Sequence, residues 1–224
     1  MLPRVLEPEV MDTEQEAHEY DAMDHAQVNR IFVQDLLTEL RAIPGPPMWQ
    51  IFDAGTGTAL IPIELLRTGW SAHIVAADAA VEMLRLCEQN IERAGFRDRI
   101  EPVLRDCKQL PECDAAFDLV MSNSIVHHIP EPRDVLAECW RVLRPGGVLF
   151  IRDLLRPRTV DEVEQIVSTY AGAGTKDQQQ LFRQSLHAAL TVDEVAQLLR
   201  ELSIPAEWVM QTSDRHWTIA GRKP

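Results

Sequence analysis

The chain has 224 residues, of which 46% are hydrophobic and 25% charged, the balance of a soluble globular protein with one large domain. Its 22 Lys and Arg stand against 35 Asp and Glu, and the resulting net charge of −13 disfavours a surface that binds nucleic acid. The sequence offers no apolar run of the roughly 20 residues that span a membrane, no secretory signal and no CxxC pair among its four cysteines. We therefore expect a cytoplasmic protein that lacks a disulfide framework and acts neither on nucleic acid nor on a membrane.

The first predicted element is an amphipathic helix over residues 13–40, where apolar residues recur at three- and four-residue spacing. Asp21, His25 and Asn29 lie four residues apart and would share one face of this helix, with Tyr20 beside them. This polar stripe is either a solvated surface or the inner face of a lid over a functional site. We expect residues 1–48 to form a helical lid.

Residues 49–156 alternate between predicted strands and helices, and form the expected core. The strands are 49–55, 72–78, 99–106, 117–124 and 148–155, and the helices are 58–69, 80–95 and 132–143. Repeated strand–helix units of this kind are typical of a parallel sheet that is covered by helices on both faces.

The rest of the chain is predicted to form a helical cap over 157–205 and a hairpin over 206–224. The segment TVDEV occurs at 159–163 and again at 191–195, and both copies are T-x-x-E capping boxes that begin a helix. Residues 172–180 between them read as a linker. The hairpin has two strands about a tight turn at 213–216.

Polar side chains follow each strand at its carboxyl end, which is where open parallel sheets bind their ligands. The first strand is followed by a Gly-Thr-Gly turn, and the turn of the last hairpin joins the same edge if the strand before it runs parallel to the others. The residues in question are Asp53, Gly55, Thr56, Gly57, Asp78, Asp106, Ser122, Asn123, His127, His128, Arg152, Asp153, Asp214, Arg215 and His216.

The sequence of the glycine turn helps to distinguish between two classes of cofactor that could bind there. A dinucleotide fingerprint needs a third glycine where this chain has Leu60, although Asp78 does lie where a ribose-binding acid would. Asp53 would also repel the pyrophosphate of a dinucleotide. The same carboxylate suits a ligand that carries an ammonium group, such as the methionine end of S-adenosylmethionine.

With these motifs in order, the chain resembles the class I S-adenosylmethionine-dependent methyltransferases. The segments IFDAGTGTA, VAADAAVEML, RDCKQLP, FDLVMSNSIVHHIP and RVLRPGGVLFI carry the resemblance, over about residues 49–151. It is strongest to the small-molecule branch that includes quinone and sterol C-methyltransferases. The resemblance implies a Rossmann-like doubly wound sheet of seven strands, the last of them antiparallel, with S-adenosylmethionine as the cofactor and S-adenosylhomocysteine as the product.

The resemblance also implies roles for individual residues. Asp53 and the turn from Gly55 through Thr56 to Gly57 would line the methionine moiety, and Tyr20 would reach the cofactor carboxylate. Asp78 would hold both ribose hydroxyls. The remaining cofactor-binding residues would be Met83 against the adenine, Asp106 and Cys107 at its amino group, and the backbone of Ser122 and Asn123 beside the methyl group.

The sequence determines less about the residues that would contact the molecule that accepts the methyl group. His127 and His128 either supply a general base or pack the loop after the fourth strand. Arg152 forms an ion pair, with Asp153 or at a helix cap, or clamps an anionic substrate. Residues 214–216 are either an exposed turn or part of a mixed-charge pocket.

We expect no metal site, because these potential ligands lack compact spacing. The predicted function is in-line transfer of a methyl group to a small polar acceptor that such a mixed-charge pocket would bind. The alternatives are a regulator that binds S-adenosylmethionine without turnover and an NAD-dependent oxidoreductase.

Overall fold

The computed structural model describes residues 2–10, 12–23, 25–41, 43 and 45–224. These divide into two compact units. The first comprises Val10–Asn123, Asp134–Ile151 and Ala220–Pro224, and the second comprises Met1–Glu9, Ser124–Arg133 and Arg152–Ile219. The seven strands form one sheet in the order β3-β2-β1-β4-β5-β7-β6, in which β7 runs antiparallel. The predicted fold class is therefore confirmed.

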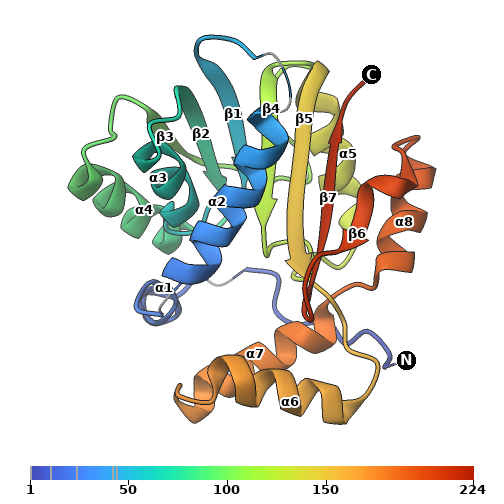
Figure 1. Ribbon diagram of the computed structural model, residues 1–224. Helices are drawn as coiled ribbons and strands as arrows, with labels where there is room; N and C mark the ends of the chain where they lie inside the picture. Colours follow the sequence, from blue (N-terminus) through green and yellow to red (C-terminus); the bar gives the residue numbers. More distant parts are fainter. Residues whose placement is uncertain (1, 11, 24, 42, 44) are drawn as a thin grey trace. The chain divides into compact units, whose positions relative to one another are not determined.

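The first unit holds the parallel strands that were expected from residue 49 onward. β1 (Trp49–Ala54) pairs in parallel with β2 (Ala72–Asp78) and with β4 (Phe117–Asn123), and β2 pairs with β3 (Ile100–Leu104). Figure 1 shows these four strands side by side. The helices α3 (Leu60–Arg67), α4 (Val81–Ala94) and α5 (Pro132–Val142) lie where the sequence predicts them. The parallel pairing brings the carboxyl ends of β1, β2 and β4 to one edge.

The N-terminal helix is broken, so the prediction of one helix over 13–40 is wrong. α1 (Glu14–Asp21) begins with a capping box between Thr13 and Glu16, and α2 (Ala26–Arg41) follows after a turn. At the break the Met23 amide donates to the Tyr20 carbonyl, which also forms a 3.0 Å hydrogen bond with His25 Nε2. These local hydrogen bonds replace helical ones. Asp24 lies outside the described residues.

One hydrophobic core fills the first unit on the side of α2, α3 and α4. Phe32 and Leu36 of α2 are fully buried against Ile51 of β1 and Ile74 of β2, and Phe32 meets the ring of Phe150 edge-on at 5.1 Å between centroids. α2 is therefore part of the core packing along its apolar face, which follows from its three- and four-residue spacing.

β5 (Leu143–Leu154) begins before the Pro-Gly-Gly segment, earlier than the sequence suggests. The Gly146 amide donates to the Lys223 carbonyl, and the Lys223 amide donates to the Gly147 carbonyl. A Cβ on Gly147 would lie 2.6 Å from a Leu143 methyl and 2.9 Å from the Asp118 carbonyl, so only glycine fits there. The Pro-Gly-Gly segment therefore lies within the strand.

The second unit holds three helices and a hairpin. The helices are α6 (Val160–Ala171), α7 (Lys176–Ala188) and α8 (Val192–Glu201), followed by a short 3-10 helix η1 (Ala206–Trp208). β6 (Val209–Gln211) and β7 (His216–Arg222) pair antiparallel, as predicted. The linker prediction over 172–180 is wrong from Thr175 onward, because Thr175 and Gln178 form a capping box that begins α7.

The two TVDEV segments begin helices, but only one has the full capping box. Thr191 and Glu194 exchange both hydrogen bonds. Thr159 accepts from the Glu162 amide, whereas the Glu162 carboxylate accepts from the Arg158 amide instead. No helix among the described residues is both long and apolar enough to cross a membrane.

Candidate cofactor site

The Gly-Thr-Gly turn after β1 is held in a left-handed conformation. Gly55 has φ of 70° and Gly57 has φ of 55°, and Ala59 follows with φ of 62°. The Gly57 amide donates to Asp78 Oδ2 at 2.8 Å, and the Thr56 amide donates to the Ala77 carbonyl at 2.8 Å. The turn is therefore tied to the end of β2, and its glycines are required by their backbone angles.

Asp78 keeps hydrogen-bonding capacity after holding this turn. Its Oδ2 accepts from Gly57 and its Oδ1 accepts from the Ala80 amide at 2.9 Å. An ionised carboxylate has about four acceptor positions. With the backbone hydrogen bond of Ala79 also counted, acceptor capacity for a ligand hydroxyl therefore remains on Asp78 without breaking the hydrogen bonds to the turn.

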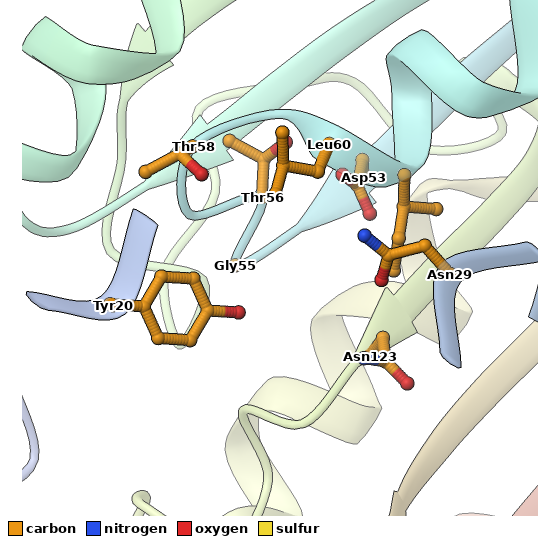
Figure 2. A pocket seen from close by; sticks show the side chains of 9 residues that line it. Tyr20, Asn29, Asp53, Gly55, Thr56, Thr58, Leu60 and Asn123 are labelled. Carbon is orange, nitrogen blue, oxygen red and sulfur yellow. The ribbon is translucent and has the colours of Figure 1, made fainter. Parts of the chain in front are cut away.

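A small polar pocket lies beside the turn, as Figure 2 shows. Its volume is about 20 Å³, space for no more than a water molecule or two. Figure 2 also shows the Tyr20 hydroxyl pointing into this space. The lining residues are Tyr20, Asn29, Asp53, Gly55, Thr56, Thr58, Leu60, Ile61 and Asn123.

Several polar groups in this pocket are buried. Asp53 is 3% exposed, and none of the ion pairs among the described residues includes it. Burial raises the pKa of Asp53 to about 7; a hydrogen bond with the Thr56 side chain opposes this rise, and the nearby charge of Asp78 adds to it. Thr58 Oγ1 and Asn123 Oδ1 are buried with no hydrogen-bond partner in the described part of the chain. The pocket therefore offers a carboxylate and two polar atoms to a ligand with cationic and hydroxyl groups.

Tyr20 covers the glycine turn from the side of α1. A Cβ placed on Gly57 would lie 3.5 Å from Tyr20 Cε1, and the Tyr20 ring packs on His25 with 4.7 Å between centroids. Burial and the charges of Asp78 and Asp53 raise the pKa of Tyr20 to about 12, so its hydroxyl is a neutral donor. Tyr20 also packs against a cluster that contains the buried Met83.

The other predicted cofactor residues differ in their surroundings. Asp106 is half-exposed, with its Oδ1 3.0 Å from Lys108 Nζ. Cys107 is buried, and its sulfur accepts a hydrogen bond from the Gly55 amide. Ser122 donates its hydroxyl to the last carbonyl of β1 at 2.7 Å. The structure therefore brings Cys107 and Ser122 to the end of β1, whereas the Asp106 carboxylate contacts Lys108.

Four lining residues were not among the predicted cofactor contacts. One of them, Asn29, belongs to the polar stripe for which a position facing a functional site was one of the two interpretations, and it is buried at 9% exposure. Thr58, Leu60 and Ile61 follow the turn and carry no distinguishing pattern.

The predicted acceptor residues all lie in the second unit or at its boundary strand. Arg152 is buried and its Nε donates to Thr218 Oγ1 at 3.0 Å. The neighbouring Asp153 accepts from His127 Nδ1 at 2.5 Å. Adjacent residues of a strand point to opposite faces, so these two side chains contact different groups.

The turn before β7 forms its own polar cluster. Tyr170 donates its hydroxyl to Asp214 at 2.7 Å, and the Arg215 guanidinium lies 3.3 Å from the centre of the Tyr170 ring. His216 Nδ1 is 2.8 Å from Ser213 Oγ. Burial, followed by the charges of Arg215 and Arg152, lowers the pKa of His216 to about 4, so this ring is neutral at neutral pH.

Comparison with known proteins gives a consistent result. A methyltransferase domain model matches residues 52–151. The chain is 30% identical to a ubiquinone/menaquinone biosynthesis C-methyltransferase of Geotalea daltonii over 122 residues, which cover 54% of this chain and 52% of the relative. It is 30% identical to the 27-O-demethylrifamycin SV methyltransferase of Amycolatopsis mediterranei over 158 residues, which cover 66% of this chain and 55% of the relative. The chain thus spans about half the length of these curated relatives.

A solved structure shares the fold over nearly the whole chain. It is a Methanococcus maripaludis protein described as an S-adenosylmethionine-dependent methyltransferase, with a TM-score of 0.76 and 19% identity over 98% of both chains. The matched domain model, the relatives and the seven-stranded sheet agree with the glycine turn and the acid after β2. Residues 52–151 therefore match a methyltransferase domain, and the chain has the fold of a solved S-adenosylmethionine-dependent methyltransferase.

Proposed function

We propose that the chain binds S-adenosylmethionine at the carboxyl ends of β1, β2 and β4 and is a methyltransferase for a small polar acceptor. The observation that carries the proposal is the buried carboxylate of Asp53, which has no cationic partner among the described residues. A buried charge without a partner is costly, and the ammonium group of the cofactor would supply one. When bound, the cofactor supplies a methyl group that its sulfonium already activates.

The residues of the first unit divide the binding task by chemistry. Asp53 neutralises an ammonium group, the glycines at 55 and 57 allow a ligand to approach the backbone, and Asp78 accepts from a ligand hydroxyl. Tyr20 donates its neutral hydroxyl to a carboxylate. Met83, Asp106, Cys107, Ser122 and Asn123 remain proposed cofactor contacts by their resemblance to the family.

Tyr20 lies over the glycine turn, where a Cβ on Gly57 would be 3.5 Å from Tyr20 Cε1. We infer that α1 moves when the cofactor enters and that Tyr20 then covers it. The same movement would exclude water from the reacting groups.

For the acceptor, we propose the mixed-charge residues of the second unit, Arg152, Asp214, Arg215 and His216. Arg152 suits an anionic group of the acceptor, and His216 is a neutral ring that can accept a proton. His127 and His128, the predicted general bases, both contact the Glu7 carboxylate. Either of them could act as a free base only if Glu7 moved away.

The similar proteins do not narrow the acceptor to one atom. By name, one relative methylates carbon and another acts on a demethylated oxygen of a rifamycin. We propose a small polar acceptor and leave the acceptor atom to experiment, beginning with thiols, amines and carboxylates.

Calorimetric titration with S-adenosylmethionine, S-adenosylhomocysteine and NADH tests the proposal. We expect saturable binding of the first two and none of NADH. Asp78→Asn should weaken cofactor binding about 100-fold, because a hydrogen bond to a charged group is lost, whereas Asp98→Asn on the exposed surface should not. Binding of NADH alone would refute the cofactor, and binding without S-adenosylhomocysteine production from any acceptor would favour the regulator.

A further inference from the structure

Three side chains that the proposed function does not use converge within the second unit. Glu7 Oε1 lies 3.4 Å from His127 Nε2 and 3.1 Å from His128 Nδ1. All three of these ligand-type atoms lie within 4.8 Å of one another. The exposed fractions of the side chains are 8% for Glu7, 3% for His127 and 21% for His128. This is a buried cluster, unlike the many acidic groups of the surface.

Asp153 fixes the orientation of the His127 ring by contacting the ring nitrogen that does not face Glu7. Its Oδ1 lies 2.5 Å from His127 Nδ1, and its two oxygens also accept from the backbone amides of Val126 and Leu154. An ionised carboxylate only accepts hydrogen bonds, so Nδ1 carries the proton. In the neutral ring, Nε2 then presents its lone pair to Glu7. A carboxylate behind a histidine is the arrangement that orients histidine ligands in metal sites.

His128 presents a second lone pair to the same oxygen. Its ring forms a hydrogen bond with the Pro8 backbone, while its Nδ1 has no hydrogen-bond partner in the described part of the chain. Nε2 therefore donates to the Pro8 carbonyl, and Nδ1 is the acceptor nitrogen. Glu7 Oε1 is also buried without a hydrogen-bond partner. Two acceptor atoms 3.1 Å apart repel one another unless a proton or a metal ion lies between them.

The N-terminal segment is fastened firmly enough to hold Glu7 in place. Arg4 donates to four backbone carbonyls at 2.8–3.1 Å, those of His127, Ile129, Pro130 and Ala188. The Ser185 hydroxyl donates to Glu7 Oε2 at 3.2 Å, which turns Oε1 toward the histidines. The cluster is therefore organised before any ligand enters it.

We propose that Glu7, His127 and His128 form a binding site for a divalent transition-metal ion of the zinc class. Imidazole nitrogens with one carboxylate suit zinc and its neighbours, whereas magnesium and calcium prefer oxygen ligands. A tetrahedral ion with bonds of about 2.0–2.1 Å separates its ligand atoms by about 3.3–3.4 Å. The distances of 3.4 and 3.1 Å from Glu7 to the two histidines match this spacing. Three protein ligands leave a fourth position for water or another ligand.

The site was not expected from the sequence because its carboxylate lies far upstream of the histidines. Its occupancy does not depend on the proposed methyl transfer. The ion would join the N-terminal segment to the loop after β4, which predicts that it stabilises the folded protein.

The test uses the full chain, freed of any affinity tag and of metal. Zn²⁺ is titrated in competition with a chromophoric chelator, in the absence of S-adenosylmethionine. We expect one ion per chain, with a dissociation constant of about 1 μM or tighter, and a rise in melting temperature. Glu7→Gln and His128→Asn should weaken binding at least about 100-fold, and Asp153→Asn, which only positions His127, by about 10- to 100-fold.

Matched controls come from an exposed pair in α1. Glu14 and His18 lie 4.0 Å apart with side chains 77% and 61% exposed, so Glu14→Gln and His18→Asn should leave Zn²⁺ binding unchanged. A Co²⁺ spectrum of the wild type gives a readout that does not rely on the folding of a variant. It should show d–d bands without thiolate charge transfer.

Failure of this proposal is separate from failure of the proposed function. Absence of stoichiometric binding by the wild type, a thiolate band that identifies a cysteine site, or equal binding by Glu7→Gln and the wild type would each overturn the metal site. Cofactor titration of the metal-free protein is a separate measurement, and its result bears only on the methyltransferase assignment.

Discussion

Replacing Asp53 with asparagine should stabilise the cofactor-free protein at high pH. The folded protein raises the pKa of Asp53 from 3.8 to about 7, chiefly by burial. The folded state therefore binds this proton more tightly than the unfolded state. The contribution of this proton to the free energy of unfolding is fully present below pH 3.8 and is lost as the pH rises to about 7. At 1.36 kcal/mol per pH unit, the total loss is about 4 kcal/mol, and about 3 kcal/mol of it falls between pH 5 and pH 8.

The assay is urea unfolding of wild type and Asp53→Asn, followed by tryptophan fluorescence at half-unit steps from pH 5 to pH 8. Asparagine has nearly the same shape and no ionisation, so the stability of the variant relative to wild type should grow by about 3 kcal/mol over this range. Asp98→Asn, an exposed acid, should show no such growth. A difference between Asp53→Asn and wild type that stays constant with pH would refute the assignment of a buried, unpaired carboxylate.

The same carboxylate should make cofactor affinity depend on pH. Below pH 7 an ammonium-bearing ligand must displace the Asp53 proton, so calorimetry should show affinity falling up to about tenfold per pH unit in wild type; a weak but pH-independent affinity is expected in Asp53→Asn. Tyr20→Phe should lower cofactor affinity about fivefold through loss of one hydrogen bond, with an unchanged melting temperature; unchanged affinity would remove Tyr20 from the site. Thr191→Ala should cost about 1 kcal/mol of unfolding free energy, and more than Thr159→Ala, because the Thr191 hydroxyl also donates a hydrogen bond to Glu194 Oε2 at 3.1 Å. Equal losses would show that this additional hydrogen bond contributes nothing.

Much of the fold follows from local patterns in the sequence. The strands β1, β2 and β4 are apolar runs with an Asp or Asn as the last or next-to-last residue, and the helices between them carry their apolar residues on one face. Their order and parallel pairing follow from the handedness of strand–helix–strand units. The break between α1 and α2 could not be seen this way, because it depends on the Tyr20 carbonyl accepting hydrogen bonds from two directions.

The residues of the candidate site likewise include some that the sequence reveals and some that it does not. Asp53, Gly55 and Asp78 are recognisable because they follow strands at fixed offsets from the glycine turn. Asn29 lines the same pocket from a helix that starts beyond a helix break, so no spacing relates it to them. Glu7 is still less accessible to sequence reasoning, because its contact with His127 depends on where the N-terminal segment is fastened.

The second unit has a consequence for how the protein is made. Arg4 hydrogen-bonds to Ala188, 184 residues later in the chain, and to the loop after β4. During synthesis, residues 2–9 leave the ribosome before the loop after β4 and well before Ala188, to which Arg4 donates hydrogen bonds. Contacts with such sequence separation form slowly. Residues 2–9 therefore reach their native contacts late, and they stay accessible to proteases and chaperones until Ala188 has been translated.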